Sequence, residues 1–175
     1  MLLSYKKVDN NNYKIAFNIQ KQLWPDETDL RNFIDKANDT REDNISFIVY
    51  LDEKPIGITG VYKEDIDDDS LWLDWFGILH EYRGRGYGKK VLLDTIDYCK
   101  KLNNYEYLRL DTIYWDGRPA IYLYDNVMTF KEKYTKENND DFKNCWIYTY
   151  SLNGKNELWN NRFLGLTDYY LNCRD

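Results

Sequence analysis

Residues 71–90 read LWLDWFGILHEYRGRGYGKK, an apolar and aromatic run followed by a basic segment rich in glycine. The run 71–79 has the composition of a strand, and residues 86–102 carry apolar side chains at helical spacing. Gly84, Gly86 and Gly88 leave the turn between them almost bare of side chains. Such a turn exposes backbone N–H groups at the positive end of the helix dipole. The segment 83–90 therefore predicts an anion site of the kind that binds phosphates.

Two other phosphate-binding loops are excluded by their spacing. A dinucleotide-binding loop has the pattern GxGxxG with an acidic residue about 20 positions further on. A Walker loop has the pattern GxxxxGK[ST]. The chain has GRGYGKK at residues 84–90, which matches neither pattern.

The elements around this segment alternate in type. Apolar periodicity and turn residues predict, besides a strand at 71–79 and a helix at 86–102, a strand near 4–8, helices at 13–23 and 29–37, strands at 45–51, 55–62 and 105–112, a helix that begins near Asp116, and strands at 129–134 and 145–152. With 175 residues the chain fits one domain with its own core. The order predicts a single domain of the mixed α/β (α+β) class.

The basic segment and its surroundings resemble the GNAT N-acetyltransferase family, whose loop has the pattern [RQ]-x-x-G-x-[GA]. Arg83, Gly86 and Gly88 match this pattern, and Ile78 stands at the apolar position five residues before the arginine. The stretch AIYLY at 120–124 is similar to the family's A-x-x-L-Y. The resemblance covers the two opening helices, the hairpin and the core from 71 to 130.

The chain departs from the family pattern in three places. The segment DNVMTF takes six steps from Tyr124 to phenylalanine where the family usually takes five, and Thr129 stands at the glycine position. Gly117 stands where the family often has asparagine. Residues 153–175 extend past the usual last strand.

A GNAT-like fold over residues 1–152 is what the resemblance implies. Its mixed central sheet would have about six to seven strands, flanked by about four helices, and would splay between the fourth and fifth strands. Residues 153–175 would form a C-terminal extension packed on the same domain or on a partner subunit. An aromatic tail of this kind could also pair two subunits into a homodimer.

Acetyl-CoA is the co-substrate that the resemblance implies, with no metal. The residues that would bind it are Ile78, Leu79, Arg83, Gly84, Arg85, Gly86, Tyr87, Gly88 and Lys89. Loop amides would hold the pyrophosphate, and pantetheine would pair with the backbone near Ile78 in the gap between the splayed strands.

Three residues are candidates for a catalytic role: Tyr124, Asp74 and Asp111. Tyr124 occupies the family's thiolate-donor position; the alternative is a packing tyrosine on an amphipathic helix. Asp74 and Asp111 are candidate bases or structural carboxylates, and strand alternation predicts that Asp74 shares a face with Ile78.

Three residues that follow the first helix complete the predicted site. Trp24, Asp26 and Glu27 would lie over the acceptor site, or would simply end the helix with a capping carboxylate.

The net charge and the composition limit the classes of partner that the protein can have. A net charge of −6 and a pI near 4.9 argue against nucleic acid and favour a cationic acceptor. The acidic run EDIDDD at 64–69 is interpreted as a solvated loop. No apolar run of about 18 residues or signal peptide is present, so we expect a cytoplasmic protein that does not enter a membrane. Cys99, Cys145 and Cys173 are interpreted as free thiols.

Two hypotheses on function follow. The first is an N-acetyltransferase that moves the acetyl group of acetyl-CoA to a small-molecule amine or a protein amine. The second is a non-catalytic module that binds acyl-CoA and regulates. The retained Tyr124 beside a complete loop favours the enzyme. Another acyl group or another acceptor stays open.

Overall fold

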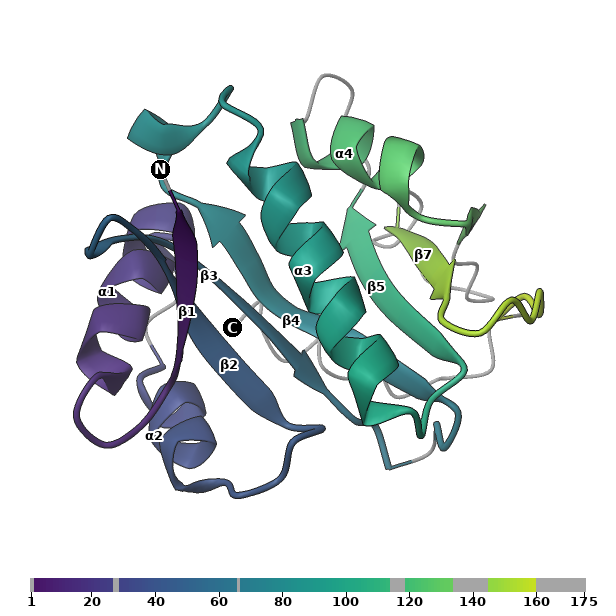
Figure 1. The fold of residues 1–175 in the computed structure, drawn as a ribbon, viewed down its shortest axis with the longest axis horizontal. Helices are drawn as coiled ribbons and strands as arrows, with labels where there is room; N and C mark the ends of the chain where they lie inside the picture. Colours follow the sequence, from purple (N-terminus) through teal and green to yellow (C-terminus); the bar gives the residue numbers. More distant parts are fainter. Residues whose placement is uncertain (1, 27–28, 66, 114–118, 134–144, 160–175) are drawn as a thin grey trace.

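One mixed sheet organises the chain (Figure 1). The computed structural model describes residues 2–26, 29–65, 67–113, 119–133 and 145–159. Within these ranges the strands are β1 (Leu3–Lys7), β2 (Ile45–Leu51), β3 (Lys54–Tyr62), β4 (Ser70–Ile78), β5 (Tyr107–Ile113), β6 (Phe130–Lys133) and β7 (Cys145–Ser151), in the sheet order β1-β2-β3-β4-β5-β7-β6. The helices are α1 (Tyr13–Leu23), α2 (Arg31–Asn38), α3 (Tyr87–Leu102) and α4 (Pro119–Val127). The predicted class, strand number and helix number are confirmed.

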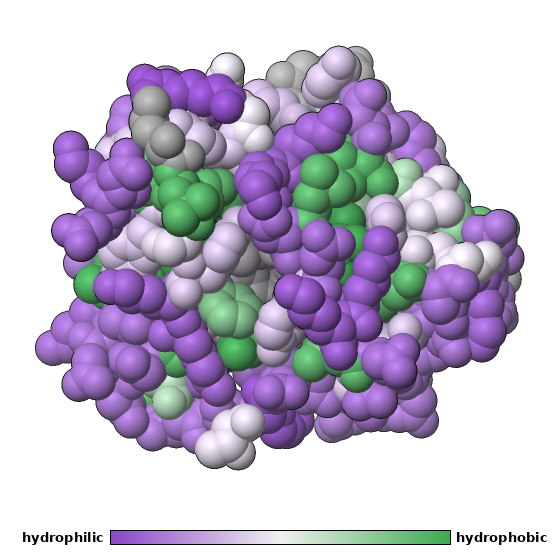
Figure 2. All heavy atoms as spheres, viewed as in Figure 1, coloured by the Kyte–Doolittle hydropathy of each residue, from purple (hydrophilic) through white to green (hydrophobic). Residues whose placement is uncertain are grey.

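Helices cover both faces of the sheet because successive strand residues point to opposite sides. On β2, Ile48 packs in the cluster under α1 and α2, whereas its neighbour Val49 packs with Val91 of α3. Figure 1 shows α3 running across the sheet, with α1 and α2 at the β1–β3 end and α4 at the β5–β7 end. The solvent side of α3 is hydrophilic (Figure 2), as expected for a helix with a single buried stripe.

The sheet opens between β4 and β5. These strands run parallel and pair only from Ser70 to Trp72 on β4 and from Tyr107 to Arg109 on β5, and then diverge (Figure 1). The predicted splay is therefore confirmed. A bulge lies on β4 nearby, because the step from Asp74 to Gly77 faces only the step from Gly60 to Ile58 on β3. A bulge bends its strand and changes the direction of the side chains that follow it.

Arg109 fastens the short region where β4 and β5 pair. It is fully buried, and its guanidinium donates through Nε to Ser70 Oγ of β4 and through Nη1 to Thr149 Oγ1 of β7, each at 2.9 Å. A buried charge needs such donors and acceptors around it, because an uncompensated charge in the interior is costly. The one side chain therefore links three strands below the gap.

The acidic run 64–69 differs from the solvated loop that the sequence predicted. Asp67 is buried, and Trp72 donates its indole Nε1–H to Asp67 Oδ2 at 3.0 Å. Glu64 is half-buried. Asp65 and Asp68 are exposed as predicted, and the prediction was wrong for Asp67. A run of like charges suggests solvent, but a hydrogen bond from an indole N–H can satisfy one buried carboxylate. Trp159, from the segment after β7, is also buried and packs edge-on against Trp72 with ring centroids 6.3 Å apart.

Element boundaries differ from the predictions by a few residues. β5 begins at Tyr107 instead of 105, since the Glu106 and Tyr107 amides donate to Asp69 O and begin the pairing there. The predicted start of α4 at Asp116 lies outside the described residues. Cys99 and Cys145 are free and buried, and burial raises the pKa of both thiols to about 12. Cys173 lies outside the described residues.

Candidate active site

The glycine-rich loop joins β4 to α3 through one turn of 3-10 helix, His80–Tyr82. Arg83 closes the loop from within, because its Nε donates to Ile78 O at 2.8 Å. Gly84 and Gly86 have φ angles of +73° and +81°, a region that other residues enter only with strain. A Cβ atom at either position would meet nothing within 4 Å. The loop is thus an open concavity lined by backbone.

The N-terminus of α3 faces this concavity without a side-chain cap. Gly86 is the N-cap residue, and no side chain makes a capping hydrogen bond there. The first bond of the helix runs from Lys90 N–H to Gly86 O at 3.1 Å, so the amides of residues 87–89 precede the helical ladder. The positive end of the helix dipole adds to the charge of Lys89. This arrangement can hold an anion such as a pyrophosphate.

A cleft of about 1250 Å³ runs from this loop through the gap between β4 and β5 to α2. It is bordered by residues 73–78 of β4, residues 110–113 of β5, the start of α3, α4, and Asp35 and Lys36 of α2. No described strand pairs with β4 on its β5 side beyond Trp72, so backbone groups on that edge before Ile78 are open to pairing with a ligand. The cleft therefore fits an elongated molecule whose anionic end lies at the loop.

Tyr124 reaches the cleft from α4. It lines the cleft and is 7% exposed, and its ring lies 6.2 Å from Phe76 of β4 and 5.5 Å from Tyr148 of β7, centroid to centroid. It belongs to the core cluster on the α3 side of the sheet together with Leu110. The tyrosine is thus fixed at the gap on the α3 side.

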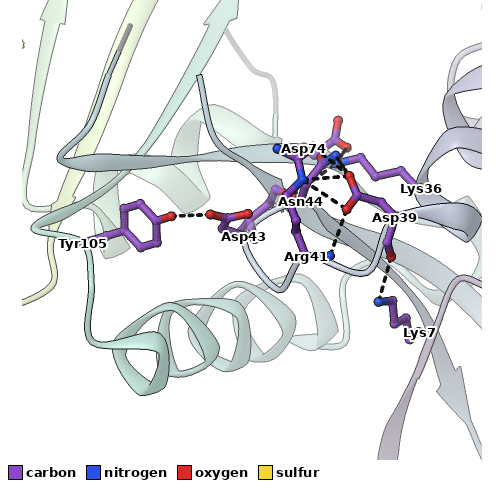
Figure 3. A network of polar contacts seen from close by, with 9 residues as sticks. Lys7, Lys36, Asp39, Arg41, Asp43, Asn44, Asp74 and Tyr105 are labelled. Carbon is purple, nitrogen blue, oxygen red and sulfur yellow. Dashed lines mark hydrogen bonds and ion pairs between the residues drawn. The ribbon is translucent and has the colours of Figure 1, made fainter. Parts of the chain in front are cut away.

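Asp74 is engaged by its neighbours. Its Oδ2 lies 3.1 Å from Lys36 Nζ, and its Oδ1 accepts the Trp75 N–H at 2.9 Å. Lys36 also donates to Asn44 Oδ1 and to Val61 O, so its ammonium is held on three sides. Figure 3 shows Lys36 reaching from α2 to Asp74, within a network that continues through the segment before β2.

The predicted face of Asp74 was wrong. Asp74 faces Lys36 of α2, whereas Ile78 packs with Val91 of α3 on the other side of the sheet. The bulge on β4 lies between the two residues and shifts the alternation by one position. Sequence spacing alone assumes an unbroken period of two, so the bulge could not be foreseen.

Asp111 lies across the gap on β5. Its Oδ2 is inaccessible to solvent and has no hydrogen-bond partner among the described residues, although the residue as a whole is half-buried. Burial raises the pKa of this carboxyl to about 7, and the charge of Glu64 adds to the shift. By strand alternation Asp111 points to the opposite face from Leu110, and hence away from the Tyr124 side.

Most of the predicted site residues meet in this cleft. Those that line it are Trp24, Asp74, Ile78, Arg83, Gly84, Gly86, Tyr87, Gly88, Lys89, Asp111 and Tyr124. Leu79, Arg85 and Asp26 do not line it: Leu79 is buried in the cluster under α1, and the other two are exposed. Glu27 lies outside the described residues.

Sequence reasoning missed several lining residues. Glu64, Lys36 and Tyr62 also line the cleft. The position of Glu64, two residues after the hairpin strand ends at Tyr62, could have indicated that it lies near the site, but the residue was grouped with the acidic run. Lys36 carried none, because a lysine on an amphipathic helix normally faces solvent.

Comparison with known proteins agrees with this geometry. The model of the Acetyltransferase (GNAT) family matches residues 11–130, and the chain belongs to that family. No curated protein matches the chain by sequence.

Solved structures share the fold at low identity. Arabidopsis thaliana NAA60, solved with a bisubstrate analogue, has a TM-score of 0.67 and 17% identity over 88% of this chain and 100% of that one. The ribosomal-protein-S18-alanine N-acetyltransferase of Escherichia coli has a TM-score of 0.65 and 15% identity over 89% and 97%. A spermidine N-acetyltransferase chimera of Vibrio cholerae SpeG and hSSAT has a TM-score of 0.66 and 15% identity over 87% and 96%.

The described part of the chain contains neither a metal-binding cluster nor a membrane-spanning helix. No group of three or more His, Cys, Asp or Glu side chains there could hold a metal ion. No helix among those residues is long and apolar enough to cross a bilayer.

Proposed function

We propose that the protein transfers the acetyl group of acetyl-CoA to a primary amine by direct attack on the thioester. Acetyl-CoA is the co-substrate of the GNAT acetyltransferase family to which the chain belongs; NAA60 has also been solved with acetyl-CoA. The observation that carries the proposal is that the uncapped start of α3 opens onto the same cleft as Tyr124 and Asp111. The bound co-substrate supplies an activated carbonyl carbon.

The donor end fits the anionic part of acetyl-CoA. Gly84 and Gly86 have open space where a side chain would stand, so phosphates can approach the loop amides closely. Lys89 adds a positive charge at the same place. The edge of β4 between Trp72 and Ile78, which no described strand pairs on its β5 side, provides N–H and C=O groups to which the pantetheine amides can bind.

Asp111 is the base that we favour over Asp74. Both oxygens of Asp74 are already engaged, since Oδ2 pairs with Lys36 Nζ and Oδ1 accepts the Trp75 N–H. Asp111 has an oxygen without a partner among the described residues and a pKa raised to about 7, close to the value at which a base works best near neutral pH. Asp111 would take the proton of the attacking ammonium.

Tyr124 is the proton donor that we propose for the departing sulfur. It belongs to the α3 side of the sheet, while Asp111 points to the α1 and α2 side. An amine that enters from the Asp111 side would expel the thiolate toward the tyrosine. The N–C bond forms as the C–S bond breaks, with Asp111 holding the proton of the ammonium and Tyr124 supplying one to sulfur. The second proton that the nitrogen loses as the amide forms restores the Tyr124 hydroxyl.

A screen of amines tests the proposal through thiol release from acetyl-CoA and mass analysis of the acceptor. It should include polyamines and peptides with a free N-terminus, since the structurally similar proteins include a spermidine acetyltransferase and one that acts on an alanine of a ribosomal protein. We expect acetyl-CoA-dependent acetylation of a cationic amine. Tight binding of acetyl-CoA without any acetylated product would favour the alternative, a non-catalytic acyl-CoA-binding module.

We also propose a cytoplasmic location, a domain that ends at residue 152, and packing of residues 153–175 on the domain or on a partner subunit. Burial of Trp159 against Trp72 supports packing on the same domain.

A further inference from the structure

The cleft carries opposite charges at its two ends. Arg83 and Lys89 border the loop end. Carboxylates gather at the other end, where Asp35, Glu64, Asp74 and Asp111 line the cleft. Lys36 is the one cation at that end among the described lining residues, and it is already paired with Asp74. The acceptor end is therefore negative overall.

Glu64 and Asp111 are the inner part of this acidic end. Glu64 follows β3 and Asp111 lies on β5, close enough that the charge of Glu64 contributes to the raised pKa of Asp111. No ion pair joins either of them, or Asp35 at the rim, to a cation within the described ranges. Asp111 Oδ2 is inaccessible to solvent and has no hydrogen-bond partner in the part of the chain that the structure describes. Neighbouring carboxylates, one of which has an oxygen shielded from solvent, repel each other unless a cation lies between them.

Aromatic rings border the same end of the cleft. Trp24 and Trp75 meet edge to face with centroids 5.1 Å apart, and Tyr62, two residues before Glu64, also lines the cleft. Aromatic faces attract cations, and they also provide apolar surface for an alkyl chain. Lys36 illustrates this, since its ammonium lies 5.8 Å from the centroid of the Tyr62 ring.

We propose that this end of the cleft binds a small aliphatic amine with a second cationic nitrogen, and that Glu64 selects it. The inference rests on the proposed function. One ammonium gives a proton to Asp111 before its nitrogen attacks the thioester. The nitrogen loses a second proton as it becomes a neutral amide, and this proton replaces the one that Tyr124 gives to sulfur. The second nitrogen stays charged throughout and remains paired with Glu64. An acceptor with one charge would leave Glu64 uncompensated, and one with a carboxylate would be repelled.

Three four-carbon probes that differ only at one end separate these cases. They are 1,4-diaminobutane, 1-aminobutane and 4-aminobutanoate, titrated by calorimetry into protein saturated with CoA, so that binding is read without turnover. We expect 1,4-diaminobutane to bind about tenfold or more tightly than 1-aminobutane, and 4-aminobutanoate not to bind. Equal binding of the diamine and the monoamine would overturn the inference, as would tighter binding of a peptide with a neutral side chain at its N-terminus.

Two variants from the same acidic run locate the effect. Glu64→Gln should remove most of the preference for the diamine, while binding of 1-aminobutane should hold. Asp68→Asn is the matched control, because Asp68 is 89% exposed and pairs with Lys63. A preference that survives Glu64→Gln, or that falls equally in the control, would show that Glu64 does not select the acceptor.

Turnover distinguishes this failure from failure of the proposed function. Acetylation of 1-aminobutane as fast as of the diamine would leave an N-acetyltransferase and overturn only the selection by Glu64. Preferred binding of the diamine with no acetylation of any amine would support the subsite and overturn the proposed reaction.

Discussion

Substitution can separate the proposed chemical role of Tyr124 from its packing. Tyr124→Phe keeps the ring beside Phe76 and Tyr148 but removes the hydroxyl. If that hydroxyl protonates the thiolate, kcat should fall by about 100-fold while the affinity for acetyl-CoA holds, because general acid catalysis is worth about 10²- to 10⁴-fold. Steady-state kinetics and calorimetry would measure the two effects.

A control for this substitution lies on the same helix. Tyr122 also lines the cleft, but it is 75% exposed, so Tyr122→Phe should leave kcat nearly unchanged. Full turnover in Tyr124→Phe, with the chemical step shown to be rate-limiting, would contradict the role assigned to Tyr124.

Asp111 should govern the pH profile of the reaction. A base works when deprotonated, so kcat/KM should rise with pH through about 7, the raised pKa of this carboxyl, and then level off. Asp111→Asn should lower kcat/KM strongly and remove this rise, leaving an increase toward the pKa of the free amine, about 10. Asp74→Asn should keep the rise near 7, since Asp74 is paired with Lys36. If the rise instead disappears in Asp74→Asn, the two carboxylates have been assigned the wrong way round.

At the scale of elements, the strand-to-helix loop combines backbone strain with an open surface. Gly86→Ala would force a Cβ atom onto a residue with φ of +81°, at a cost of about 1 kcal/mol in the free energy of unfolding. The same substitution would fill part of the concavity and disturb the start of α3. We therefore expect acetyl-CoA to bind at least about tenfold more weakly by calorimetry, with the fold retained.

Gly154 provides the matched control for this loop. It has φ of +88° and, like Gly86, open space around the position of a Cβ atom, but it does not line the cleft. Gly154→Ala should lose similar stability and keep full affinity for acetyl-CoA. Equal affinities in the two variants would mean that the loop is not where the co-substrate binds.

Whole-molecule stability should respond to the buried Asp67. Burial raises its pKa to about 6 from 3.8, with a further contribution from the hydrogen bond to Asp69. Between these values the folded protein holds a proton that the unfolded chain releases, so the free energy of unfolding falls as pH rises from about 4 to about 6 and levels off above. Asp67→Asn keeps an oxygen for the Trp72 indole and should remove this contribution.

Urea unfolding followed by tryptophan fluorescence measures this effect across the same pH window. The difference between wild type and Asp67→Asn matters, because the contributions of all other carboxylates are common to both proteins. Asp68→Asn, at an exposed position in the same run, should run parallel to wild type. Parallel curves for Asp67→Asn as well would contradict the raised pKa.

The sequence predicted what depends on local pattern. Periodicity and turn residues were enough for the order of the elements, and the glycines of the loop were enough for its position and backbone form. The residues it could not place depend on contacts between distant segments. Lys36 is fixed by Asp74 and Val61 O, and Asp67 is drawn inside by Trp72. The bulge on β4, which reversed the expected face of Asp74, leaves no composition signal of its own.

The limited pairing between β4 and β5 has a mechanical consequence. Three ladder pairs join these strands, whereas seven join β5 to β7. The sheet therefore has two parts, β1–β4 and β5–β7, joined by a short ladder. The Arg109 side chain connects the two parts through its hydrogen bonds to Ser70 and Thr149. A ligand that contacts both β4 and β5 across the gap would restrict the motion of the two parts of the sheet relative to each other. A substitution that removes the Arg109 hydrogen bonds should therefore lower the affinity for both proposed substrates, although Arg109 does not line the cleft.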